Sequence, residues 1–176
     1  MLLPGKIVIG NNEYRIKLLT CKNEKQVQAL CEQCSDFSML IEGRLPEKNA
    51  GHEILFDLPP DKALEDKYVF GIYNENDCLS AVIELVKDYK IPGEWMLGLM
   101  MISPNERGKG LGRRLHEFVK TWVSEFQGKL LRIGVVEENY RAHKFWVEMG
   151  YTEVDRIKRK FGNKEHVVIV MNSRLT

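Results

Sequence analysis

The feature that most constrains this chain is a glycine-rich turn between an apolar run, residues 95–102, and an amphipathic run, residues 111–126. This order predicts a strand, a tight turn and a helix. Glycine at alternate positions lets successive backbone N–H groups point into one concavity, where a helix also presents unpaired amides. The positive end of the helix dipole would add to this, so the turn predicts a phosphate or pyrophosphate site. The turn consists of Arg107, Gly108, Lys109, Gly110, Leu111 and Gly112, and is followed by Arg113 and Arg114.

The spacing of the turn excludes one phosphate loop and disfavours another. A Walker loop needs glycine five residues before Gly108 and Ser or Thr after Lys109, but Ser103 and Gly110 occupy those places. A dinucleotide fingerprint needs its third glycine one residue after Gly112, in an early βαβ unit. This turn lies past the middle of the chain.

Length and composition favour one ordinary domain over residues 1–176, because 44% of the residues are hydrophobic and 29% are charged. Residues 1–6 lack the pattern of a signal peptide, and the longest uncharged apolar run, residues 95–102, is too short to span a membrane. We therefore expect a cytoplasmic protein. Cys31 and Cys34 lack a second pair or paired histidines, so free, partly buried thiols and no metal are expected.

The charge of the chain is small overall but unevenly distributed. A net charge of +1 offers no general attraction to nucleic acid or to an anionic membrane. Residues 20–66 carry five Lys or Arg against ten Asp or Glu, whereas residues 103–176 carry fifteen against nine. The basic second half suits a phosphate-rich ligand, and the acidic first half suits a cationic partner, although solvated surfaces also produce such imbalances.

Hydrophobic periodicity predicts the remaining elements. The N-terminal half should form a hairpin around Asn11-Asn12, a helix capped by Asn23, one or two helices within residues 36–58, and strands at 68–73 and 79–86. The strand at 95–102 should be buried on both faces, and Gly98 within it indicates a bulge or the close approach of a ligand.

The second half of the chain should contain one β-α-β crossover. A helix over residues 111–126, ended by Gly128, separates the strand at 95–102 from a strand at 130–136, so those two strands should be parallel. Asn139 should cap a further helix that Gly150 ends, before a hairpin of residues 151–161 and 166–171. These elements predict a mixed α/β fold.

Two motifs together resemble the GNAT superfamily of N-acetyltransferases, in particular its small bacterial-type members. One is Arg-x-x-Gly-x-Gly at residues 107–112, and the other is Asn-x-x-Ala-x-x-Phe-Trp-x-x-Met-Gly-Tyr at residues 139–151. The resemblance implies the GNAT fold, a mostly antiparallel sheet with one splayed parallel strand pair, flanked by helices. It also implies an acetyl-CoA-binding core at residues 95–151 and variable acceptor-side helices at residues 20–66.

The activity that the resemblance implies is transfer of the acetyl group of acetyl-CoA to a primary amine, by direct attack in a ternary complex. The acceptor would be a small molecule or a protein amine, and the enzyme a monomer or homodimer. A GNAT-fold module that binds acetyl-CoA without turnover is the alternative. The residues expected to bind the coenzyme are Met100, Met101, Ile102, Arg107, Gly108, Lys109, Gly110, Leu111, Gly112, Arg113, Asn139, Ala142, Phe145 and Trp146.

A base is needed because an alkylamine with a pKa near ~10.4 is protonated at neutral pH. Glu84 is the first candidate, since it alternates with apolar neighbours and burial would raise its pKa. A solvent-facing strand position is the equally weighted alternative. Glu94 is a fallback, as are Asp88, Glu137 and a water chain.

The chain departs from the family at the acid, because Trp146 stands where many relatives have a tyrosine. Tyr140 or Tyr151 could substitute, although a thiolate leaves tolerably without help. Glu148 stands where relatives often have a lysine that reaches the terminal phosphate, a role left to Arg113, Arg114 or Lys144. For a cationic amine acceptor, the available carboxylates are those of Asp36, Glu42, Glu53 and Asp57.

Overall fold

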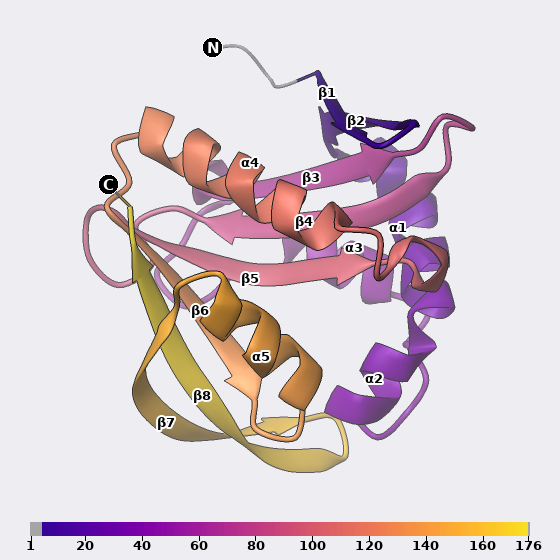
Figure 1. The fold of residues 1–176 in the computed structure, drawn as a ribbon. Coiled ribbons are helices and arrows are strands. Elements are labelled where there is room, and N and C mark those ends of the chain that lie inside the picture. The colour runs from indigo at the N-terminus through magenta and orange to yellow at the C-terminus, as the bar shows by residue number, and fades with distance from the viewer. Residues whose placement is uncertain (1–4, 176) are drawn as a thin grey trace.

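The computed structural model describes residues 5–175 and is built around an eight-stranded mixed sheet (Figure 1). The strands lie in the order β1-β2-β3-β4-β5-β6-β8-β7. Their bounds are β1 Lys6–Ile9, β2 Asn12–Leu18, β3 Lys67–Tyr73, β4 Leu79–Val86, β5 Glu94–Ile102, β6 Leu130–Val136, β7 Thr152–Phe161 and β8 Lys164–Arg174.

Helices flank this sheet, which confirms the predicted mixed α/β class and the GNAT arrangement. The α-helices are α1 Glu24–Gln33, α2 Ser35–Ile41, α3 Ala50–Phe56, α4 Leu111–Glu125 and α5 Tyr140–Glu148. Short 3-10 turns are η1 Cys21–Asn23, η2 Leu64–Asp66 and η3 Pro104–Glu106. Within residues 5–175, no helix is long and apolar enough to cross a membrane.

The strands β5 and β6 form the predicted parallel pair, and they are joined along only part of their length. Three residue pairs connect them, from Glu94 opposite Leu130 to Met96 opposite Arg132. Beyond Arg132, β6 continues in antiparallel pairing with β8, while β5 continues with β4. The two parallel strands therefore separate after Met96, as the two divergent ribbons in Figure 1 show.

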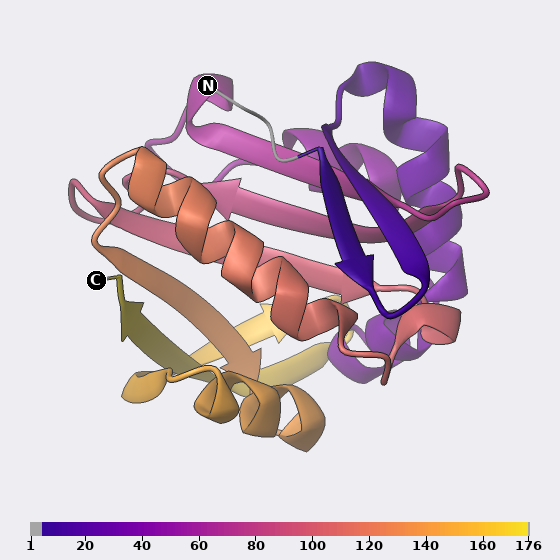
Figure 2. The same cartoon turned by 45° about the horizontal axis from the view of Figure 1, so that its top comes forward.

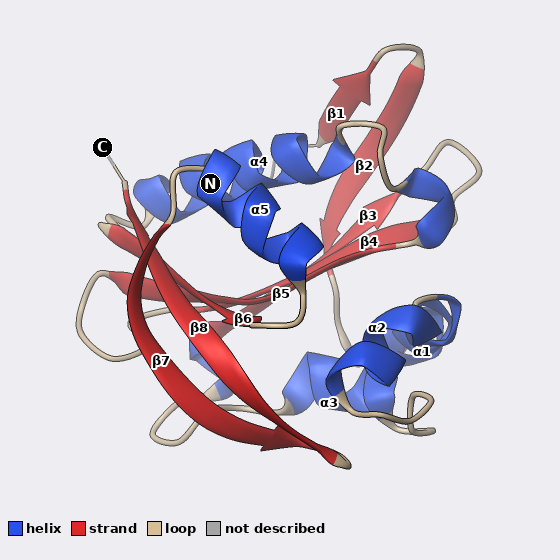
Figure 3. Ribbon diagram, turned by 60° about the horizontal axis from the view of Figure 1, so that its bottom comes forward, coloured by secondary structure: helices blue, strands red, loops and turns tan. Residues whose placement is uncertain are grey.

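Helices cover both faces of the sheet (Figures 2 and 3). On one face, α4 buries Leu115, Val119 and Trp122 against β3, β4 and β5, and α5 packs beside it over β6 and β8. On the other face, α1 and α3 cover Val69 and Val82. The loops that follow β5 and β6 therefore emerge between two helical layers.

Two predicted caps were wrong in detail. Asn23 precedes α1 without capping it, because its side-chain oxygen accepts from Thr20 N at 2.9 Å, one turn earlier. At the end of α4, Gln127 takes the left-handed conformation with a φ of 59°, and Gly128 follows it. A Cβ on Gly128 would lie 2.2 Å from Val123 Cγ1, so tight packing, and not a positive φ, requires glycine there.

The structure also tests the predictions for the first hairpin and for the cysteines. The first hairpin turns at Gly10 and Asn11, one residue earlier than predicted, because Asn12 already pairs in β2. The cysteine prediction is confirmed: Cys31 and Cys34 are both buried free thiols.

Candidate active site

The glycine turn leads directly into the N-terminus of α4. Gly108 and Gly110 have φ angles of 77° and 86°, and Gly110 is the N-cap residue. These are left-handed conformations that side chains disfavour. A Cβ on either glycine would meet nothing within 4 Å, so the space in front of the helix is open. The first N–H groups of α4 have no partner within the helix, and the turn therefore fits an anion.

The first turn of α4 lies against both β5 and α5. A Cβ on Gly112 would lie 3.4 Å from Ile102 Cδ1 and 3.5 Å from the ring of Phe145. Asn139 caps α5 as predicted, because its side chain accepts from Ala142 N at 3.2 Å. The structure thus brings the two sequence motifs together beside the opening between β5 and β6.

The bulge predicted from Gly98 is confirmed and lies where the parallel strands begin to separate. On β4, Glu84 pairs with Leu99 while the next residue, Leu85, pairs with Leu97, so Gly98 has no partner. A bulge locally disrupts the ladder and leaves backbone groups of the extra residue unpaired. Such groups are available as donors to a ligand at this position.

Glu84 lies next to this bulge. A Cβ on Gly98 would be 3.4 Å from the Glu84 carboxyl carbon, so a larger residue there would crowd the carboxylate. Only 19% of the Glu84 side chain is exposed, which excludes the solvent-facing alternative. Burial raises the pKa of Glu84, and the ammonium of Lys67, 3.0 Å away, opposes that rise.

The structure does not bring the fallback carboxylates to the bulge. Glu94 is buried at the closed end of the parallel pair, where its Oε2 lies 3.7 Å from Arg132 Nη1. Asp88 accepts from Gly93 N at 2.6 Å within the preceding turn. Glu137, after β6, forms an ion pair with Arg156 on the edge strand β7.

The candidate acids are poorly placed to donate a proton. Tyr140 is 76% exposed at the start of α5. Tyr151 is buried, with its hydroxyl 3.2 Å from His116 Nε2, and burial raises the pKa of Tyr151. Trp146 is 9% exposed and packs on the rings of His116, Phe145 and Tyr151. Trp146 therefore belongs mainly to the core between α4 and α5.

The Arg107 side chain needs a correction, because it is already bound within the protein. Its guanidinium forms two hydrogen bonds to the Asp36 carboxylate, at 2.5 and 3.1 Å, and its Nε donates to Ile102 O at 2.8 Å. The hydrogen bond from Arg107 lowers the pKa of Asp36. Arg107 thus ties α2 to the end of β5, and what it can offer a phosphate at the turn is its backbone.

The other cations near the turn are only loosely held. Arg113 lies 3.7 Å from Glu148, and Lys109 lies 3.3 Å from Glu106, whose Oε2 also accepts from the hydroxyl of Tyr14. About half of each cationic side chain is exposed, 56% for Arg113 and 49% for Lys109. Exposed pairs of this kind contribute little, so both side chains are free to move to an anion.

Sequence reasoning missed a contact between α2 and the tip of the β7–β8 hairpin (Figure 1). Lys164 Nζ donates to Met39 O at 3.0 Å and to Leu40 O at 3.1 Å. His166 Nε2 lies 2.8 Å from Ile41 O. These contacts satisfy carbonyl groups at the end of α2, which are left unpaired in any helix. They join the end of α2 to β8.

The acidic acceptor side also needs a correction. Of the four carboxylates proposed to receive a cationic amine, Asp36 is bound to Arg107 and Glu42 lies 3.0 Å from Arg44. Glu53 accepts from Asn49 at 2.9 Å. Asp57 follows α3 on an exposed stretch of chain and is near enough to Glu84 to raise its pKa.

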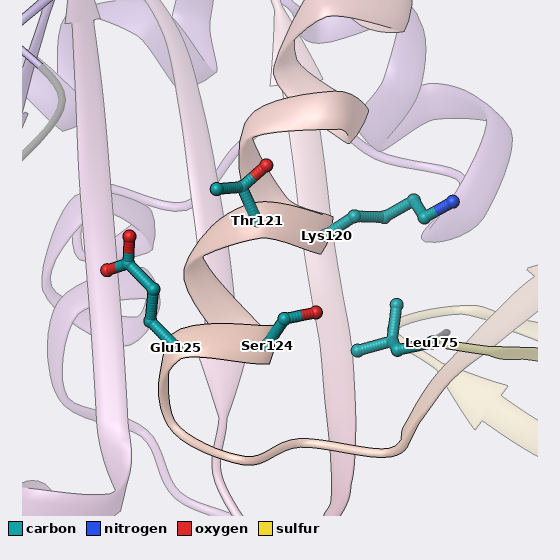
Figure 4. A pocket seen from close by; sticks show the side chains of 5 residues that line it. All are labelled: Lys120, Thr121, Ser124, Glu125 and Leu175. Carbon is teal, nitrogen blue, oxygen red and sulfur yellow. The ribbon is translucent and has the colours of Figure 1, made fainter.

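One surface depression lies away from the glycine turn. A hollow of about 510 Å³ flanks the C-terminal half of α4 and is lined by Lys120, Thr121, Ser124, Glu125 and Leu175 (Figure 4). It is at the opposite end of α4 from the glycine turn and holds none of the predicted site residues. Within residues 5–175, no group of three or more His, Cys, Asp or Glu side chains is arranged to hold a metal.

Comparison with known proteins agrees with this arrangement. The sequence profile described as the acetyltransferase (GNAT) family matches residues 37–151. A comparison with curated proteins found no match.

Several solved structures share the fold at low sequence identity. A putative phosphinothricin N-acetyltransferase superposes with a TM-score of 0.72 at 15% identity, covering 93% of this chain and 99% of that one. Spermidine N-acetyltransferase from Vibrio cholerae, in complex with CoA and spermine, gives 0.71 at 17% identity over 92% and 95%. The ribosomal-protein-S18-alanine N-acetyltransferase from Escherichia coli gives 0.69 at 13% identity over 93% and 94%.

Proposed function

The chain belongs to the acetyltransferase (GNAT) family, and we propose that it transfers the acetyl group of acetyl-CoA to a primary amine. The observation that carries this proposal is the position of Glu84 beside the bulge at Gly98, where β5 and β6 separate. A buried carboxylate next to unpaired backbone groups suits a reaction that must remove a proton and stabilise a developing oxyanion.

The glycine turn fits the pyrophosphate of the coenzyme. Gly108 and Gly110 leave open space where a side chain would stand, and α4 begins directly behind them. We assign the pyrophosphate to the backbone of residues 107–112, with Lys109 and Arg113 as mobile counter-charges. The pantetheine arm would lie between the separated strands, along Met100, Met101 and Ile102 on one side and Asn139, Ala142, Phe145 and Trp146 on the other.

Acetyl-CoA supplies a thioester carbonyl to this site, and the protein has to deliver a neutral amine to it. Glu84 would take the proton from the acceptor ammonium, which frees the nitrogen lone pair for direct attack. Backbone N–H groups at and after the bulge would donate to the carbonyl oxygen as negative charge develops there. Both substrates would be bound together, because this scheme assigns no covalent role to a protein side chain.

The departing thiolate needs no dedicated acid in this scheme. A thiol has a pKa of about 8.5, so a thiolate is a stable leaving group near neutral pH. Trp146 cannot act as the acid, because its indole N–H can donate a hydrogen bond but is no usable source of a proton. The presence of Trp146, where many relatives have a tyrosine, favours a second candidate, a domain that binds acetyl-CoA without turnover.

We propose an amine acceptor on a small molecule or a protein. The solved structures that share the fold include a spermidine N-acetyltransferase and a ribosomal-protein-S18-alanine N-acetyltransferase, which represent both kinds of acceptor. Asp57 is the carboxylate that best supports a cationic acceptor, since Asp36 and Glu42 pair with arginines.

The test is CoA release from acetyl-CoA with a panel of polyamines, aminoglycosides, free amino acids and lysine peptides. We expect turnover with at least one cationic amine, and strong loss of turnover in Glu84→Gln with calorimetric acetyl-CoA binding retained. Binding without turnover across the panel would favour the second candidate. Failure to bind acetyl-CoA would refute both.

A further inference from the structure

Lys67 is a buried cation that the scheme above leaves without a role. It is the first residue of β3, and only 2% of its side chain is exposed. Its Nζ lies 3.0 Å from Glu84 Oε1 and donates to Asp57 O at 2.5 Å. Burying an ammonium is costly unless it is paired and hydrogen-bonded, so this placement depends on both partners.

The strand register explains why Lys67 meets Glu84. Val69 on β3 lies opposite Glu84 on β4, and Lys67 lies two residues from Val69, so Lys67 and Glu84 are diagonal neighbours. Val69 faces the layer of α1 and α3, and Lys67 shares that side of the strand. On the far side of Glu84, its Oε2 lies 3.5 Å from the position that a Cβ on Gly98 would take. Glu84 is therefore held between a fixed cation on β3 and the bulge in β5.

We propose that Lys67 is a positioning residue, which keeps the Glu84 carboxylate ionised and directed at the bulge so that it can accept the proton of the acceptor amine. This inference rests on the proposed function. It assigns Lys67 no contact with either substrate and no proton transfer of its own.

The charges around Glu84 support this role. Burial raises the pKa of Glu84, Lys67 on β3 lowers it through its charge and a hydrogen bond, and Asp57 after α3 raises it by charge repulsion. Without Lys67 the two raising effects would act unopposed, and the carboxyl would stay protonated to a higher pH. A protonated Glu84 could not act as a base.

The proton transfer balances within this pair of groups. One N–H bond of the acceptor ammonium breaks, an O–H bond forms on Glu84, and the electron pair stays on nitrogen for attack on the thioester carbonyl. Lys67 keeps its charge throughout. Its hydrogen bond to Asp57 O also holds the chain after α3, so the cation is fixed from two sides.

The direct test is the titration of Glu84 followed by NMR in protein labelled at the glutamate side-chain carboxyl carbon, with Glu84→Gln identifying the signal. Lys67→Met removes the charge but keeps an unbranched side chain, and we expect it to raise the midpoint by about one to three pH units. Lys67→Arg keeps the charge and should leave the midpoint near its wild-type position. Equal midpoints in wild type and Lys67→Met would overturn the proposal.

Kinetics provide a second measurement. The acidic limb of the pH profile of kcat/KM should move to higher pH in Lys67→Met and return in Lys67→Arg, with an unchanged KM for acetyl-CoA. Should Lys67→Met fail to fold, Lys67→Gln offers a neutral side chain that can still donate to Asp57 O, and the same shift is expected.

Different results would refute the role of Lys67 and the proposed function on which it rests. A wild-type protein without turnover, but with a midpoint that depends on Lys67, would refute the base role of Glu84. A turning-over enzyme whose profile ignores the charge at position 67 would refute the role of Lys67 alone.

Discussion

Gly110→Asp should weaken acetyl-CoA binding strongly without unfolding the protein. Gly110 caps α4 with a φ of 86°, and a Cβ there would meet nothing within 4 Å. The substitution therefore causes no steric clash. Its conformational cost is about 1 kcal/mol, since Asp and Asn tolerate the left-handed region better than most residues. The new carboxylate would stand in the space that we assign to the pyrophosphate.

The electrostatic effect follows from Coulomb's law. Two like charges about 6 Å apart, in an effective dielectric of about 20, repel by about 2.8 kcal/mol, which corresponds to a roughly 100-fold weaker Kd. The doubly charged pyrophosphate would increase this, and the open surface and salt would reduce it. The new carboxylate would also compete with the pyrophosphate for the N-terminus of α4, which weakens acetyl-CoA binding further.

Gly110→Asn is the matched control, because it has nearly the same shape and backbone preference without the charge. Calorimetry with acetyl-CoA should give a Kd for the Asp variant at least about ten-fold weaker than for the Asn variant, with the gap narrowing at high salt. Thermal unfolding of both variants should be similar. Equal affinities in two folded variants would show that the pyrophosphate does not lie at this turn.

Three further predictions concern residues around the site. Arg107→Ala should lower the free energy of unfolding by about 2 kcal/mol, more than Asp36→Asn, because it also removes a hydrogen bond to the backbone of β5; denaturant titrations giving equal losses would contradict this. Trp146→Phe should retain most turnover in the CoA-release assay while losing about 1–2 kcal/mol of stability, since the indole packs in the core; loss of activity with acetyl-CoA still bound would refute a passive role. Burial lowers the pKa of His116 to about 4 from an unperturbed value near 6.5, so the unfolded state binds its proton first. The contribution of neutral His116 to the free energy of unfolding should be fully present above pH 6.5 and fall by about 2–3 kcal/mol towards pH 4. His116→Gln should remove this pH dependence while keeping a hydrogen-bond partner for Tyr151. Denaturant titrations at several pH values measure it.

Local signals predicted the parts of the site that depend on a few consecutive residues. The positive φ angles of Gly108 and Gly110, the bulge at Gly98 and the cap at Asn139 each follow from what one residue type can do that others cannot. The parallel pairing of β5 and β6 also followed locally, because a helix between two strands leaves one common connection. These features set the opening in which we place the coenzyme.

Long-range pairings were beyond the sequence. Arg107 and Asp36 are 71 positions apart, and no pattern in either segment says that they meet. The glycine turn made Arg107 look like a phosphate ligand, whereas folding commits its guanidinium to α2. Lys67 and Glu84 are neighbours only because of the register between β3 and β4, which depends on the whole sheet. The sequence therefore indicated the sign of the net charge in each region but not which charged side chains pair with one another.

The same pairings change what the acidic first half can mean for the acceptor. A balance of −5 over residues 20–66 suggested a surface that attracts cations, but Arg44 and Arg107 pair with Glu42 and Asp36 at that surface. What remains near the bulge is Asp57, whose backbone oxygen holds Lys67 while its own carboxylate influences Glu84. Binding an amine at Asp57 would cancel that influence and lower the pKa of Glu84, whereas proton transfer needs Glu84 to be a competent base. In the scheme we propose, recognition of the acceptor and its deprotonation would therefore be coupled through one short stretch of chain after α3, and Lys67 would be the group that links them.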